Sequence, residues 1–71
     1  MSTPKRYKLL RQRFDHPAGT VCYQCFVHDY GMARDDMIES GQEHQSVTLK
    51  PDGGYPIFTV PVDDLMPDPA P

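Results

Sequence analysis

Residues 44–60, HQSVTLKPDGGYPIFTV, decide the fold that the sequence predicts. Val47 and Leu49 alternate with polar residues, which is the period of a β-strand with one buried face. Lys50–Gly54 then supplies a proline and two glycines, a composition typical of a tight turn with positive φ angles. Tyr55–Val60 resumes β-strand composition. The stretch therefore predicts an antiparallel hairpin.

Two further segments extend this hairpin into a small sheet. Arg6–Leu10 alternate polar and apolar residues, which predicts a first strand with Tyr7 and Leu9 facing inward. Thr20–His28, rich in β-branched and aromatic residues, predict the longest strand, and both of its faces carry apolar groups. A turn at His16–Gly19 separates these two strands.

The rest of the chain predicts one short helix and one short turn. Met32–Ser40 has apolar residues at helical spacing and is followed by Gly41, a residue favoured just after a helix. Val62–Leu65 can form a single 3₁₀-like turn. These elements predict a mainly β domain, either a strongly bent antiparallel sheet or a small SH3-like barrel. We expect a single domain over residues 1–66 and a disordered proline-rich tail over residues 67–71.

Length and composition exclude several classes of protein. A chain of 71 residues, 38% of them apolar, has little room for a buried catalytic cleft, so we do not expect an enzyme. No apolar run approaches the ~20 residues of a membrane-spanning helix, and no apolar segment of a secretory signal follows the basic N-terminus. Two cysteines are too few for the disulfide framework of a small secreted domain. We therefore expect a monomer in the cytoplasm.

Charge is divided unevenly along the chain. The first thirteen residues carry five cations and no acid, whereas the rest of the chain carries two cations and ten acids. A basic arm on an acidic body favours an acidic protein surface over nucleic acid as the partner, because the body would repel phosphates. In the other interpretation, these cations pair with acids on neighbouring strands. The candidate partner-binding residues are Lys5, Arg6, Tyr7, Lys8, Arg11 and Arg13.

The CxxC motif at Cys22 and Cys25 is the most specific local pattern. Two thiolates at this spacing can bind one zinc ion, and His28 or His44 could complete the site. In a β-strand, however, Cys22 and Cys25 project to opposite faces, and the glycine of a zinc knuckle is missing. The alternative is two reduced cysteines packed as small core residues. We expect no cofactor.

Four segments of the chain share a pattern with known small proteins. They are Ala18-Gly19-Thr20, Asp29-Tyr30-Gly31, Glu43–Thr48 and Tyr55–Pro61. In these segments the sequence resembles a family of small proteins encoded by tailed bacteriophages, and the resemblance covers residues 6–66. It implies a phage context in the cytoplasm of a bacterial host and supplies no catalytic residues. Small phage proteins of this kind bind host RNA polymerase, as transcription inhibitors and antiterminators do, or block defence complexes, as anti-CRISPRs do.

One leading function and two alternatives follow. The leading function is a non-enzymatic phage regulator that binds bacterial RNA polymerase through the basic arm and alters transcription. In the second, an anti-CRISPR-like inhibitor of a defence complex imitates nucleic acid with an acidic face formed by Asp35, Asp36 and Glu39. The third is a small zinc-stabilised or single-strand nucleic-acid-binding domain.

Overall fold

Five short strands and one helix make up the part of the chain that the computed structural model describes, residues 3–68. The strands are β1 (Arg6–Leu9), β2 (Val21–Gln24), β3 (His44–Thr48), β4 (Ile57–Pro61) and β5 (Leu65–Pro67). The helix α1 (Met32–Ser40) lies between β2 and β3, and the 3₁₀ turn η1 (Val62–Asp64) joins β4 to β5. The mainly β class predicted from the sequence is confirmed.

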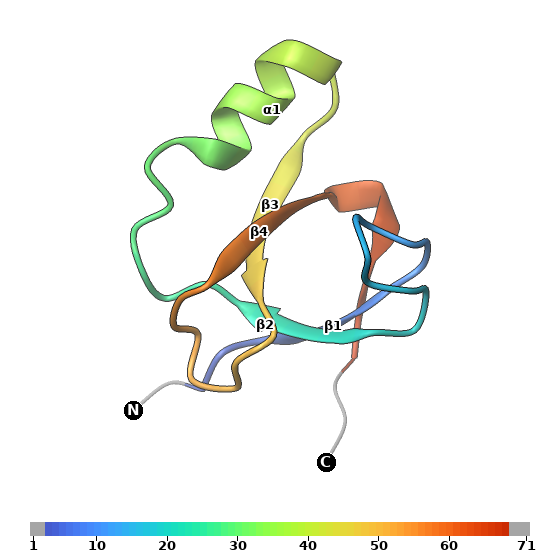
Figure 1. Ribbon diagram of the computed structural model, residues 1–71, viewed down its shortest axis with the longest axis vertical. Coiled ribbons are helices and arrows are strands. Elements are labelled where there is room, and N and C mark those ends of the chain that lie inside the picture. Colours follow the sequence, from blue (N-terminus) through green and yellow to red (C-terminus); the bar gives the residue numbers. More distant parts are fainter. Residues whose placement is uncertain (1–2, 69–71) are drawn as a thin grey trace.

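All five strands form one antiparallel sheet in the order β4-β3-β2-β1-β5. The last strand therefore pairs with the first, and β4 and β5 are the two edges. Figure 1 shows the β3–β4 hairpin running across the direction of β1 and β2, so the sheet is strongly bent. Within residues 3–68 no ladder joins β4 to β5. Of the two predicted forms, the bent sheet is observed and the closed barrel is not.

The core lies on one face of this sheet. Its buried apolar residues are Leu9, Cys22, Val47 and Val60, and the partly buried Tyr7, Phe58 and Leu65 pack against them. Residues directly opposite one another in an antiparallel ladder share a face, and the observed pairs Tyr7 with Cys22 and Leu9 with Leu65 obey this rule. Each strand therefore contributes to one small core, and the inward orientation predicted for Tyr7 and Leu9 is confirmed.

β2 is shorter than the strand that the sequence predicts. It ends at Gln24 rather than at His28, because the Phe26 N–H donates to the Gly53 carbonyl oxygen (2.9 Å) in the β3–β4 turn. Gly53 has a φ of 80°, and a Cβ at this position would lie 3.0 Å from the Gln24 carbonyl oxygen. Only glycine fits this close approach without strain. The turn after β3 therefore packs onto the end of β2 and stops its ladder.

α1 has the predicted bounds and packs against β3 and β4. Gly41, with a φ of 77°, ends the helix and donates its N–H to the Met37 carbonyl oxygen (2.8 Å). No residue of α1 is buried, and Ile38 is 72% exposed. The apolar residues at helical spacing therefore do not form a buried stripe, and polar contacts attach the helix instead.

The end of the chain is ordered further than expected. Pro67 pairs with Tyr7 in the ladder between β5 and β1, and the Asp68 N–H donates to the Arg6 carbonyl oxygen (2.9 Å). The prediction of a disordered tail is therefore wrong for these two residues, because backbone pairing with β1 holds them. Residues 69–71 of that expected tail lie outside the described residues. The 3₁₀ turn predicted after β4 is confirmed.

Candidate functional site

The predicted basic arm does not form one continuous surface. β1 alternates its side chains between the two faces of the sheet, so Arg6 and Lys8 lie on the face opposite Tyr7. Tyr7 packs against the core. Lys5 precedes the strand and is exposed. Of these four residues, only Arg6 and Lys8 share a face of the sheet.

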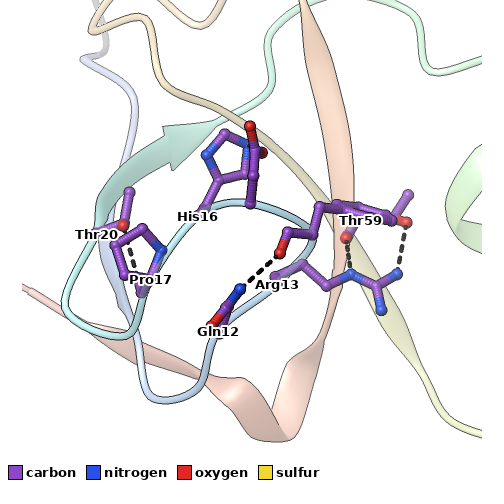
Figure 2. A network of polar contacts seen from close by, with 8 residues as sticks. Gln12, Arg13, His16, Pro17, Thr20 and Thr59 are labelled. Atoms are coloured by element: carbon purple, nitrogen blue, oxygen red, sulfur yellow. Dashed lines mark hydrogen bonds and ion pairs between the residues drawn. The ribbon is translucent and has the colours of Figure 1, made fainter.

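The two arginines of the β1–β2 loop, residues 10–20, are engaged within the chain. Arg11 lies 3.5 Å from Asp64, although its side chain is 80% exposed. Arg13 donates from Nε to the carbonyl oxygen of Thr59 (2.8 Å) and from Nη2 to the Thr59 hydroxyl (3.4 Å) (Figure 2). Because Thr59 lies in the edge strand β4, the Arg13 side chain covers a carbonyl group at the edge of the sheet. The structure thus places Arg13 in an internal contact.

Asp36 of the predicted acidic face turns towards the same threonine. The Thr59 hydroxyl donates to the Asp36 carboxylate, so Thr59 joins one residue of the basic arm to one of the acidic face. We call Arg13, Thr59 and Asp36 the Arg13 network. Asp35 and Glu39 are exposed on α1. The predicted acidic face is therefore reduced to these two exposed carboxylates.

Arg6 is also paired within the chain. Its Nε and Nη2 lie 3.0 and 2.9 Å from Oδ2 of Asp68, and the two side chains are 35% and 17% exposed. Lys5 and Lys8 make no ion pair within residues 3–68. Cross-strand pairing, the other interpretation of the basic arm, thus applies to Arg6.

A mixed basic and apolar surface lies on the outer side of β1. Arg6 lies opposite Tyr23 of β2, and Lys8 lies opposite Val21 of β2 and Met66 of β5, so these side chains share one face. None of them is buried. Figure 1 shows α1 at the other end of the molecule, away from β1. We call these five residues the β1 face.

The four candidate zinc ligands do not form a metal site within residues 3–68: Cys22 lies in the core, apart from the hollow that Cys25, His28 and His44 line. Cys22 is fully buried in the core, and burial raises the pKa of its thiol to about 11, so the thiol keeps its proton at neutral pH. The Cys25 thiol donates to the Val27 carbonyl oxygen (2.9 Å). In the described part of the chain, no three His, Cys, Asp or Glu side chains lie close enough to hold a metal ion, and this applies to His28 and His44 as well. For Cys22, the alternative of a reduced core residue is the one observed.

A hollow of about 340 Å³ beside α1 gathers several titratable groups, among them Cys25, His28, Asp29 and His44. Asp29 accepts hydrogen bonds from the Gly31 N–H (3.0 Å) and the Ser46 hydroxyl (2.8 Å). These bonds hold the pKa of the Asp29 carboxyl below its usual value. Asp29 therefore anchors the loop that leads into α1 on β3. The sequence alone does not single out this role, although an Asp two residues before a glycine is a turn signal.

Two exposed aromatic residues lie in left-handed backbone conformations, which the sequence does not predict. Phe14 (φ 54°) is 63% exposed and Tyr30 (φ 55°) is 76% exposed. Phe14 lies at the tip of a tight turn that Arg13 and His16 close with two backbone hydrogen bonds of 2.8 Å. The Arg13 guanidinium lies 4.4 Å from the centroid of the Phe14 ring, which packs edge-on against Phe58. The Arg13 network thus also positions the loop tip.

A comparison of the chain with protein-family models, curated proteins and solved structures finds no match. The fold itself defines a class: a small domain built on an open, strongly bent antiparallel sheet. No helix within residues 3–68 is long and apolar enough to cross a membrane. The candidate site therefore rests on the geometry of this chain.

Proposed function

We propose that this protein is a non-enzymatic regulator that acts in the cytoplasm of a phage-infected bacterium, where a single copy binds host RNA polymerase and alters transcription. The phage context and the polymerase come from the sequence resemblance. One observation supports binding to a protein: Arg6 and Lys8 stand beside Tyr23 on one face of the sheet, and α1 lies at the other end of the molecule from β1 (Figure 1). Arginine and tyrosine are among the residues that contribute most to the energy of protein interfaces.

The charge distribution favours an acidic patch as the docking surface. Lys8 makes no ion pair within residues 3–68, and the Arg6 side chain is 35% exposed. The ten acids of the chain all lie outside its first thirteen residues. Lys5 and Lys8, which make no ion pair within residues 3–68, attract a negative patch to β1, and this attraction raises the association rate at low salt. Nucleic acid fits less well, because the acidic remainder would face the phosphate backbone.

The test compares two lysine substitutions that change the charge equally. Lys8→Glu reverses a cation on the β1 face, whereas Lys50→Glu reverses an exposed cation in the β3–β4 turn. We expect Lys8→Glu to weaken binding to purified bacterial RNA polymerase by about fivefold or more, and Lys50→Glu to leave it nearly unchanged. Fluorescence anisotropy measures the affinity, and single-round transcription measures the effect. Equal affinities of the two variants would contradict the claim that the β1 face is the interface. If the native protein does not bind, RNA polymerase is not the partner.

Reversal of the exposed acids of α1 separates this proposal from the anti-CRISPR-like alternative. A variant with Asp35→Lys and Glu39→Lys should bind the polymerase at least as well as the native protein, because the β1 face is intact. If that variant loses its host partner while Lys8→Glu keeps it, α1 and not β1 carries the interface.

A further inference from the structure

Asp68 pairs with Arg6 through its carboxylate, the same group that an acidic side chain of a binding partner would offer. Asp68 Oδ2 accepts a hydrogen bond from Nε of Arg6 (3.0 Å) and lies 2.9 Å from Nη2 in an ion pair, and the Asp68 N–H donates to the Arg6 carbonyl oxygen (2.9 Å). A guanidinium group has five N–H donors in a planar fork that matches carboxylates. The contacts from Nε and Nη2 leave further donors on Arg6, whose side chain is 35% exposed. Arg6 can therefore bind a second carboxylate or exchange the first.

A hollow of about 350 Å³ opens beside this ion pair, and Lys5, Arg6, Tyr7, Pro67 and Asp68 line it. Tyr7 and Pro67 are partners in the β1–β5 ladder and supply its apolar part. Lys5 is exposed and makes no ion pair within residues 3–68. The lining thus contains two cations and one carboxylate. Its charge is positive even with Asp68 in place.

We propose that this hollow is a carboxylate-binding subsite that takes an acidic, extended segment of a protein partner, and that Asp68 competes with that segment for Arg6. Charge complementarity identifies the occupant, since the lining holds two cations and one carboxylate and its excess charge is positive. Pro67 and Asp68 illustrate how such a segment would bind. They lie extended along β1, and Asp68 combines a backbone hydrogen bond with a carboxylate contact to Arg6. The inference rests on the proposed function and names the chemistry recognised beside the β1 face, with which the hollow shares Arg6.

The experiment titrates the folded 71-residue chain with a capped hexaglutamate peptide and, as the uncharged control, with capped hexaglutamine. Backbone amide chemical shifts report the binding at low salt. We expect hexaglutamate alone to shift the amides of Lys5, Arg6, Tyr7 and Asp68. Lys5→Gln should weaken this binding several-fold, whereas the matched variant Lys50→Gln should leave it unchanged. Shifts spread over the whole chain, or equal effects of the two lysine variants, would overturn the subsite.

A second pair of variants tests the competition by Asp68. Asp68→Asn removes the competing charge but keeps the backbone hydrogen bond, so it should tighten hexaglutamate binding about two- to fivefold. Asp64→Asn removes the acid that pairs with Arg11 and should leave the affinity unchanged. Weaker binding by Asp68→Asn, at an unchanged melting temperature, would refute the competition. If Asp68→Asn does not fold, the Lys5→Gln comparison still decides whether the hollow binds carboxylates.

Failure of this inference and failure of the proposed function give different results. A protein that binds RNA polymerase but ignores hexaglutamate retains the proposed function and lacks the subsite. A protein that binds hexaglutamate at the hollow but does not bind the polymerase has the subsite and a different acidic partner.

Discussion

At Phe14 the chain holds an aromatic ring in a backbone conformation that suits asparagine or glycine. The left-handed conformation costs an ordinary L-residue about 1–2 kcal/mol. The ring recovers part of this cost through its edge-on contact with Phe58 and its contact with the Arg13 guanidinium. Because 63% of the side chain remains exposed, little apolar area is buried in return. The cost of the backbone strain and the stabilisation from the ring contacts therefore nearly cancel at this residue.

This balance predicts that Phe14→Asn changes the free energy of unfolding by less than about 1 kcal/mol, although it removes a phenyl ring. Asparagine tolerates a positive φ, which offsets the lost contacts. The control is Phe26→Asn, since Phe26 is 48% exposed, has no positive φ and packs against Gly53. Urea denaturation should show a clearly larger loss for Phe26→Asn. A larger loss for Phe14→Asn would mean that ring packing outweighs the backbone strain.

Burial of the Cys22 thiol makes the free energy of unfolding fall at alkaline pH. Its pKa is about 11 in the folded protein against an ordinary value of 9.0. Above pH 9 the unfolded chain loses this proton while the folded chain keeps it, so ionisation stabilises the unfolded state. Stability is therefore complete below pH 9 and falls as the pH rises towards 11, by about 2–3 kcal/mol for a shift of this size.

Urea denaturation between pH 8 and pH 11 checks this prediction. Cys22→Ala should be less stable than the native protein near neutral pH, because it leaves a cavity in the core, yet it should lack the alkaline loss that the Cys22 thiol causes. Cys25→Ala serves as the control and should retain that loss. The same pH dependence in Cys22→Ala as in the native protein would assign the effect to another group.

Polar contacts, rather than buried apolar residues, attach α1 to the sheet. It buries no residue, and nine residues are too few for a stable isolated helix. Asp36 accepts from the Thr59 hydroxyl of β4, and Asp29 anchors the preceding loop through the Ser46 hydroxyl of β3. The helix therefore depends on two carboxylates that accept hydrogen bonds from hydroxyl groups of the sheet.

Two neighbouring acids of α1 test this dependence. Asp36→Ala removes the acceptor of the Thr59 hydroxyl and should lower the free energy of unfolding by about 1–3 kcal/mol, with faster amide exchange in α1. Asp35→Ala changes the same residue type at an exposed position in the first turn, where the higher helix propensity of alanine offsets the lost charge near the N-terminus, and should change stability by less than about 0.5 kcal/mol. Equal stabilities of the two variants would show that Asp36 does not attach the helix.

Elements with local signals were predictable from the sequence, and those set by distant contacts were not. The β3–β4 hairpin follows from its own turn residues, and α1 from the glycine that ends it. The early end of β2 depends on Gly53, which reaches Phe26 from another part of the chain. The candidate site shows the same division. Its cations are visible in the sequence, but Asp68, which pairs with Arg6, lies 62 residues away.

At the scale of the whole molecule, the open sheet leaves two edges, β4 and β5, to which another strand can add. Unpaired edge strands invite association between chains, and proteins block them with short strands, prolines and charged side chains. β5 has only three residues and ends in Pro67. β4 has five residues, and the Arg13 guanidinium covers the carbonyl of Thr59, near its middle. The loop between β1 and β2 thus protects the longer edge.

This arrangement predicts that Arg13→Ala promotes self-association through β4. The Thr59 carbonyl loses its donor, so the variant should be less stable and should form dimers or larger species as its concentration rises. Arg11→Ala is the matched control, because it removes an equal charge from the same loop and its arginine is 80% exposed. Both variants become one unit more negative, so a difference in light scattering or sedimentation between them cannot come from net charge. An Arg13→Ala protein that stays monomeric at all concentrations would show that the rest of the loop, and not the guanidinium, shields the edge.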